Sequence, residues 1–455
     1  MTLKRRVLVV AIIVAFVAFL DGAVVNVALP AISRDLGGGL TVQQWVVDGY
    51  LITLGAFILT AGSLSDSFGR QRIMRIGLYG FAAASLACAL APTGLVLIIA
   101  RVAQGAAGAL LVPSSLALII ATFDRKEQGK AIGTWTAWTT AAFLAGPLLG
   151  GLLVDYADWR LVFGINVLPI AVALLLMRGL GPDDRPAHRP RVDYVGAGLG
   201  IVGLGGPVFG LIEQGRLGWD SPGVIVPIVV GAVSFAAFLW WEHRTPEPMV
   251  PLGMFGVRNF GWGNLATLFV YGGVSFGGFV LALFVQEVGG YTATLAGLVG
   301  LPSGILLILL SPRFGALTTR FGARVFMTVG PLVGASGYLY LLLVDDSVDY
   351  LTQVLPGIVL SGLGMAITVA PLTAATLGAV EQSRAGIGSA INNAVARIAG
   401  LVTVACTGLI VGSRLDLGGF HDAMVASAVL MALGGIASFI GIRRAPAEQD
   451  AVASR

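Results

Sequence analysis

Charged residues are scarce in this chain of 455 residues: 11% are Asp, Glu, Lys or Arg, whereas 56% are hydrophobic. That balance lies outside the range of soluble globular domains and predicts a protein embedded in a membrane. Histidine and cysteine are rarer still, with three and two copies. The histidines fall in predicted loops, and Cys88 and Cys406 fall within apolar runs. We therefore expect no metal site and no cofactor, and we expect carboxylates to handle protons inside the membrane.

The chain also lacks a Gly-x-x-x-x-Gly-Lys-Ser/Thr phosphate loop and any stretch long enough for a soluble domain. These absences disfavour an ATP-driven machine, so an ion gradient is the expected energy source. A membrane enzyme or sensor would need a nucleophile, a metal cluster or a soluble domain. Because none is visible, that class remains a remote alternative, and we do not expect an enzyme.

The sequence contains fourteen apolar runs long enough to cross a bilayer. The first begins near Val7 and the last begins near Ala423. If the amino terminus is cytoplasmic, 22 of the 28 Lys and Arg residues fall in cytoplasmic segments, four in outer loops and two inside spans. This asymmetry predicts fourteen helices with both termini cytoplasmic, in the inner (plasma) membrane. The net charge of +4 then reflects membrane orientation, and no nucleic-acid partner is expected.

Ionisable residues inside the runs are candidates for function, because a charge in hydrocarbon costs about 2.5–3.5 kcal/mol on insertion scales. Asp21 and Arg101 lie within runs one and four, and Asp48 lies a few residues below the outer surface in run two. The helical rise places all three in one layer. Two readings of Asp21 remain open: a proton-coupling site formed with Asp48 and Arg101, or a structural partner for Arg101.

Polar stripes follow several runs at helical spacing. In run four the stripe consists of Arg101, Gln104, Gly105 and Gly108, and we interpret this stripe as a cavity wall. Such stripes face either a water-filled cavity or another helix. The predicted substrate-cavity residues are Asn26, Gln104, Asn264, Tyr271, Ser275, Gln286, Asn393 and Arg397.

A charged turn is present twice, at residues 62–72 and, less completely, at residues 315–324. Phe68-Gly69 corresponds to Phe321-Gly322, whereas Asp66 is replaced by Thr319. The first copy resembles the loop that major facilitator superfamily transporters carry between their second and third helices. That resemblance implies a cytoplasmic gate made by Gly62, Asp66, Gly69 and Arg70.

A second motif, Gly146-Pro147-Leu148-Leu149-Gly150-Gly151, resembles the antiporter signature of the same superfamily. Apart from this resemblance, the proline and glycines predict a kinked helix whose small residues let a neighbouring helix pack closely. Together the motifs resemble the fourteen-span drug:proton antiporter family over nearly the whole chain. The chain departs from that family at Ala23, where threonine is usual, and has Asn392, Asn393 and Arg397 where some cation exporters are acidic.

The resemblance implies an all-α membrane protein of the major facilitator fold, with two six-helix bundles and two inserted helices. The expected boundaries are residues 1–180 and 259–444 for the bundles, 181–258 for the linker with helices seven and eight, and 445–455 for a cytoplasmic tail. We expect a monomer that exchanges protons for an amphipathic small molecule across the lipid bilayer, in multidrug efflux and antibiotic resistance. An exporter of lipids or of one secondary metabolite would carry the same motifs.

Overall fold

The computed structural model describes residues 2–180, 193–246, 248–381, 384–412 and 414–443. The start of the predicted linker, residues 181–192, and the predicted cytoplasmic tail, residues 445–455, lie outside these ranges. The described part is helical throughout. Its first half contains α1 (Leu3–Leu36), α2 (Gly39–Phe68), α3 (Arg70–Ala89), α4 (Gly94–Ala109), α5 (Leu111–Thr122), α6 (Arg125–Tyr156), α7 (Leu161–Gly164) and α8 (Val167–Met177).

The second half repeats this plan after an intervening helix pair, α9 (Tyr194–Leu217) and α10 (Pro222–Arg244). A 3-10 turn, η1 (Leu252–Gly256), leads into the second bundle. That bundle contains α11 (Arg258–Glu287), α12 (Ala293–Val299), α13 (Leu301–Phe321), α14 (Ala323–Tyr340), α15 (Leu355–Leu377), α16 (Ala385–Ala405), α17 (Thr407–Val411) and α18 (Leu417–Gly441). Short turns η2 (Leu341–Leu343) and η3 (Tyr350–Val354) precede α15.

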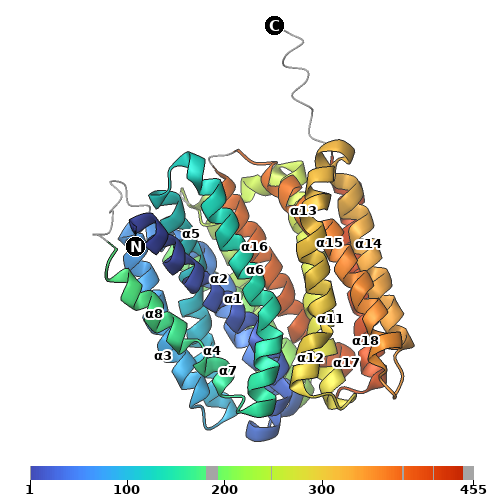
Figure 1. The fold of residues 1–455 in the computed structure, drawn as a ribbon. Coiled ribbons are helices and arrows are strands. Elements are labelled where there is room, and N and C mark those ends of the chain that lie inside the picture. The colour runs from blue at the N-terminus through green and yellow to red at the C-terminus, as the bar shows by residue number, and fades with distance from the viewer. Residues whose placement is uncertain (1, 181–192, 247, 382–383, 413, 444–455) are drawn as a thin grey trace.

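Figure 1 shows the helices of the first half, in blue to green, beside those of the second half, in yellow to red. Helices α1 and α6 form the strongest pair in the first bundle, and α14 with α15 in the second. Across the bundles, α6 packs on α12, α2 packs on α16 and α1 contacts α11. The pair α9–α10 packs mainly on α2 through α9, which also contacts α16 and α17. The inserted helices therefore flank one seam between the bundles.

The duplicated charged turn has the same backbone geometry in both halves. Gly69 separates α2 from α3 with φ 100° and ψ 131°, and Gly322 separates α13 from α14 with φ 82° and ψ 149°. Each glycine N–H donates to the carbonyl four residues earlier, on Ser65 and Thr318, at 3.1 and 2.8 Å. Side chains with a Cβ rarely adopt these angles. The sequence correspondence of Gly69 with Gly322 thus reflects a shared conformational requirement.

Eleven helices of the described chain are long and apolar enough to cross a membrane. The expected number of fourteen is not confirmed. The three further runs predicted from the sequence form α2, α3 and the short stretch α7–α8, which covers Leu161–Met177. The last of these lies at the lower end of the length that a span requires, and α3 begins with charged residues that belong to the turn.

Large apolar side chains are exposed around the outside of the bundle. Tyr79, Ile99, Leu309 and Phe439 each leave more than half of their surface open, at 61%, 60%, 62% and 56%. A water-soluble surface does not carry so many such residues on successive helices. The exposed belt fits contact with lipid.

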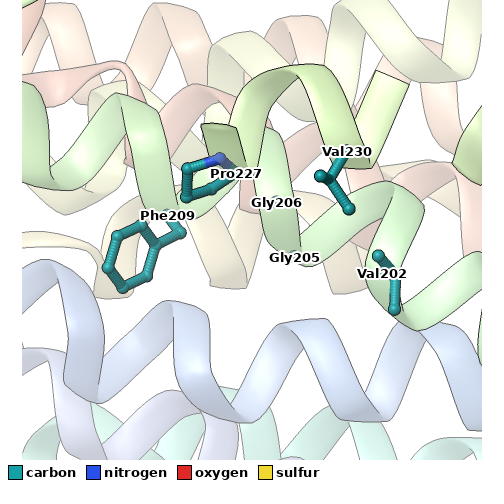
Figure 2. Close-up of a pocket in the computed structure, with 6 residues that line it drawn as sticks. All are labelled: Val202, Gly205, Gly206, Phe209, Pro227 and Val230. Atoms are coloured by element: carbon teal, nitrogen blue, oxygen red, sulfur yellow. The ribbon is translucent and has the colours of Figure 1, made fainter. Parts of the chain in front are cut away.

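An apolar pocket lies on the α9–α10 pair (Figure 2). It is lined by Val202, Gly205, Gly206, Phe209, Pro227 and Val230. Because no charged or hydrogen-bonding side chain lines it, this pocket offers no means of orienting a polar substrate. The candidate site lies elsewhere.

Candidate transport site

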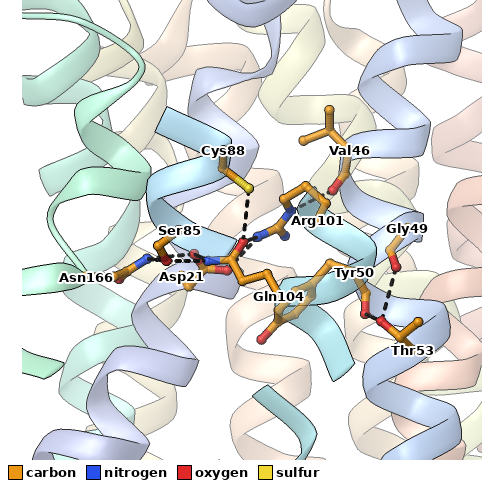
Figure 3. Close-up of polar contacts among 10 residues, drawn as sticks. All are labelled: Asp21, Val46, Gly49, Tyr50, Thr53, Ser85, Cys88, Arg101, Gln104 and Asn166. Atoms are coloured by element: carbon orange, nitrogen blue, oxygen red, sulfur yellow. Dashed lines mark hydrogen bonds and ion pairs between the residues drawn. The ribbon is translucent and has the colours of Figure 1, made fainter. Parts of the chain in front are cut away.

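Asp21 and Arg101 form a buried ion pair within the first bundle. Arg101 Nη1 donates to Asp21 Oδ2 at 2.7 Å, and both side chains are almost completely buried. The other carboxylate oxygen, Oδ1, accepts from Gln104 Nε2 and from Asn166 Nδ2, each at 2.8 Å. Because α1, α4 and the α7–α8 junction all contribute, the carboxylate holds three helical segments together (Figure 3).

Gln104 and Arg101 extend this network to two more helices. Gln104 Nε2 also approaches Ser85 Oγ of α3 at 2.8 Å, and its Oε1 accepts from Arg101 Nη1 at 2.7 Å. Arg101 Nε donates to the Val46 carbonyl of α2 at 2.9 Å. The guanidinium lies over the Tyr50 ring, 4.2 Å from its centroid. A buried charge pair is stable only when its remaining hydrogen-bonding groups are satisfied, and these contacts supply that.

The stripe on α4 packs against neighbouring helices instead of lining a cavity wall. A Cβ at Gly105 would collide with the backbone carbonyl of Tyr50, and one at Gly108 would lie 3.2 Å from the Phe81 ring. Gln104 itself is fully buried in the network. The glycines allow α4 to approach α2 and α3 closely enough for Arg101 and Gln104 to reach their partners.

Asp48 lies apart from this network. It is completely buried, and neither carboxylate oxygen has a hydrogen-bond partner. Trp45 and Ile52, one turn away on either side, pack against α9 and α16. Asp48 therefore belongs to the face of α2 that meets the inserted helix and the second bundle. An isolated buried carboxylate is far more stable protonated than ionised.

The predicted cavity residues of the second bundle divide into two groups. Asn264 is buried and accepts from Asn392 Nδ2 at 3.1 Å, and Asn392 also donates to Thr267 Oγ1 at 2.8 Å. Gln286 is 9% exposed and bonds within its own helix to the Ala282 carbonyl. The remaining predicted residues of this bundle retain accessible surface: Tyr271, Ser275, Asn393 and Arg397. Asn26, on α1 of the first bundle, is also partly exposed.

The Gly146–Gly151 motif packs α6 against both bundles. A Cβ at Gly146 would lie 2.6 Å from that of Ala23, and one at Gly150 would lie 2.7 Å from the Val24 carbonyl, so both glycines fit against α1. A Cβ at Gly151 would lie 2.5 Å from the Ala293 carbonyl of α12. On the same side of α6, the Pro147 carbonyl faces Gly297 of α12. The predicted packing face is therefore present, and it spans the two bundles.

Hydrogen bonds join the bundles at the face opposite the amino terminus. Asp155, near the end of α6, accepts from the backbone N–H groups of Ala293 and Thr294 at 3.0 and 2.7 Å. Gln43 Nε2 donates to Glu287 Oε1 at 2.6 Å. Gln44 Nε2 donates to the carbonyls of Val404 and Ala405 at 2.8 and 3.1 Å. This face of the molecule is held shut by α6–α12, α2–α11 and α2–α16 contacts.

The predicted gate residues lie at the other face, where α2 ends and α3 begins. Gly62 lies in α2 with open space around its Cα, Gly69 forms the turn, and Arg70 starts α3 partly buried. The backbone of Asp66 is helical, but its side chain lies outside the described part of the chain. The gate role of these four residues stays a prediction.

Three residues of the network were not predicted from the sequence: Asn166, Ser85 and Tyr50. Asn166 does not stand out in the sequence, although its side chain donates to Asp21 directly. The available signal was the carboxylate itself, because a buried carboxylate has two oxygens and one arginine cannot satisfy both. Lone polar residues in neighbouring apolar runs were the natural partners.

A repeated all-helical bundle with a lipid-facing exterior and a buried ion pair defines a multi-pass membrane transporter. Residues 11–404 match the family model of the Major Facilitator Superfamily, and the chain belongs to that family. The predicted membership of this superfamily is confirmed, whereas the narrower fourteen-span drug:proton antiporter family stays a prediction. Multidrug and antibiotic resistance proteins are among its relatives.

Two of those relatives cover most of the chain. The multidrug resistance protein Stp of Mycobacterium tuberculosis (strain CDC 1551 / Oshkosh) is 37% identical over 406 residues, which are 88% of this chain and 74% of Stp. The methylenomycin A resistance protein of Bacillus subtilis (strain 168) is 34% identical over 412 residues, 89% of this chain and 87% of the relative. Among solved structures, a D-xylose-proton symporter has the same fold, with a TM-score of 0.68 at 14% identity and coverage of 97% and 99%.

Proposed function

We propose that this protein is a proton-coupled antiporter that exports amphipathic small molecules by alternating access. The observation that carries the proposal is the buried Asp21–Arg101 pair with its amide partners. A carboxylate whose charge is balanced by one arginine can accept a proton when that arginine moves away. Relatives named for multidrug and methylenomycin A resistance support export as the direction of transport.

The transport cycle follows from the contacts between the bundles. Opening the face opposite the amino terminus requires breaking the contacts of Asp155, Gln43 and Gln44 with the second bundle. A proton taken up on Asp21 would release Arg101 and weaken the hydrogen-bonded link between α1 and α4. Asp48, which has no partner, is the second candidate carrier of a proton. The substrate would bind between the bundles, near Asn26, Tyr271, Ser275, Asn393 and Arg397.

We further propose fourteen spans with both termini cytoplasmic, in the inner membrane. The eleven apolar helices, together with α2, α3 and α7–α8, provide that number. The distribution of Lys and Arg supports the orientation. In this arrangement the face holding Gly69 and Gly322 is cytoplasmic, and the Asp66–Arg70 turn acts as the cytoplasmic gate of a monomer without enzymatic activity.

Dedicated export of one secondary metabolite is the second candidate function, because one close relative is named for resistance to a single antibiotic. A growth-inhibition panel on cells with and without the gene separates the two. Protection against chemically unrelated compounds supports multidrug efflux. Protection against one compound class supports the dedicated exporter.

The Asp21→Asn variant tests proton coupling. It preserves the shape of the side chain and abolishes titration, so substrate binding should persist while exchange driven by a proton gradient is lost. Purified protein in proteoliposomes, with internal pH followed as substrate is added, provides the measurement. Asp220→Asn, at an exposed site between α9 and α10, is the matched control and should exchange at the wild-type rate.

Asp21→Asn leaves Arg101 buried without a counter-charge, which lowers the free energy of unfolding by about 3–5 kcal/mol. The double variant Asp21→Asn with Arg101→Gln removes both charges, and its thermal melting reports whether the bundle still folds. Wild-type proton exchange in either variant would assign coupling to Asp48 or to a carboxylate at the rim instead.

A further inference from the structure

Arg397 lies near the middle of a membrane span, Gly386–Val411, without an acidic partner. Its Nε is buried and has no hydrogen-bond partner, and the part of the chain that the structure describes provides no ion pair for it. The residue as a whole is only partly buried. Arginine stays charged at any physiological pH. A positive charge is therefore fixed within a membrane span without a counter-ion among the described residues.

The surroundings of Arg397 place this charge at the seam between the bundles. One turn further along α16, Leu401 packs with Ile52 of α2. A Cβ at Gly400 would lie 2.9 Å from Ser275 Oγ of α11. Arg397 thus lies where α16 faces α2 and α11, one turn from the contact between Gly400 and the partly exposed Ser275.

No acid among the residues that the structure describes forms an ion pair with this guanidinium. Tyr50 interacts with its charge. Asp21 is paired with Arg101, and neither carboxylate oxygen of Asp48 has a hydrogen-bond partner. Glu213 accepts a hydrogen bond from Trp45, and Glu287 accepts one from Gln43, both near the face opposite the amino terminus. The described part of the chain therefore leaves this charge open to a counter-ion carried by a bound molecule.

We propose that Arg397 anchors an acidic group of the exported molecule, a carboxylate or a comparably ionised oxygen. The planar guanidinium presents a fork of donors that matches two such oxygens, and partial burial strengthens the pairing. Tyr50 lies between this site and the proton site, because its ring also supports Arg101. An anion bound at Arg397 is thereby placed next to the ion pair whose release starts the cycle. This inference rests on the proposed function and assigns its substrate class.

Matched probes of one shape and different charge test the assignment. For naphthalene, anthracene and pyrene, the carboxylic acid, its methyl ester and the aminomethyl derivative are titrated into full-length protein in lipid nanodiscs. In at least one ring system the wild-type protein should bind the acid more tightly than the ester and the amine. Arg397→Gln should weaken acid binding about tenfold to hundredfold and leave ester binding unchanged.

Arg397→Lys keeps the charge but loses the fork, and should retain part of the preference for the acid. Arg34→Gln removes one positive charge at an exposed site and should bind like the wild type. Equal binding of acid and ester by the wild type in every ring system, or acid binding unaffected by Arg397→Gln, overturns the inference.

Proton exchange in proteoliposomes separates this inference from the proposed function. Proton movement driven by the esters or amines but not by the acids contradicts the role of Arg397 and leaves antiport intact. Proton movement driven by none of the compounds in the wild type contradicts both.

Discussion

The carboxylate of Asp21 accepts hydrogen bonds from two amide side chains as well as from an arginine. Asn166 Nδ2 donates to the same oxygen as Gln104 Nε2, and the two amides hold the carboxylate in one orientation. Asn166→Ala removes one of these donors without changing any charge. A hydrogen bond to a charged group contributes about 1.5–3 kcal/mol.

We therefore expect Asn166→Ala to slow proton-driven exchange about tenfold or more, measured as the initial rate of substrate-induced pH change. Membrane insertion and thermal melting establish that the variant is folded. An unchanged rate would mean that Gln104 alone orients the carboxylate.

The sequence predicted part of this network and missed the rest for a physical reason. Asp21, Arg101 and Gln104 stand out because charged and amide residues are costly in an apolar run. Asn166 and Ser85 belong to other segments of the chain. Asn166 lies 145 positions from Asp21, and Ser85 lies 19 positions from Gln104. A single polar residue in an apolar run does not reveal which neighbour it faces, because helix rotation is set by packing.

At the scale of single elements, the turns at Gly69 and Gly322 allow a prediction about thermal stability. Both have backbone angles that cost other residues about 1–3 kcal/mol. Gly69→Ala and Gly322→Ala should each lower the thermal melting temperature of the purified protein. Gly62→Ala is the matched control from the same charged segment, since its surroundings are open and its helical backbone suits alanine. Melting of all three variants at one temperature would contradict the prediction.

The repeat of these turns was predictable, whereas the role of the glycine stripe on α4 was not. Correspondence between residues 62–72 and 315–324 requires only that two segments share a conformation. A stripe of small residues is compatible with a cavity wall or with close packing, and only the positions of Tyr50 and Phe81 decide between them. The number of spans was also uncertain from composition, because charged turns and the short α7–α8 segment blur the ends of apolar runs.

At the scale of the whole molecule, the proposed orientation can be measured directly. Arg216 lies at the end of α9 and Thr319 near the end of α13, both exposed. With Cys88 and Cys406 replaced by alanine, a membrane-impermeant thiol reagent applied outside intact cells should label Arg216→Cys and leave Thr319→Cys unlabelled. Permeabilised cells should label both. The reverse pattern would invert the topology.

The unpaired Arg397 also bears on which component of the ion gradient drives transport. A carrier that moves one proton inward and one anion outward transfers two positive charges toward the cytoplasm in each cycle. Every elementary charge that crosses 100 mV contributes about 2.3 kcal/mol. Export of an acid by this protein would then draw about twice that amount from the membrane voltage, and would continue at external pH values where no proton concentration difference remains.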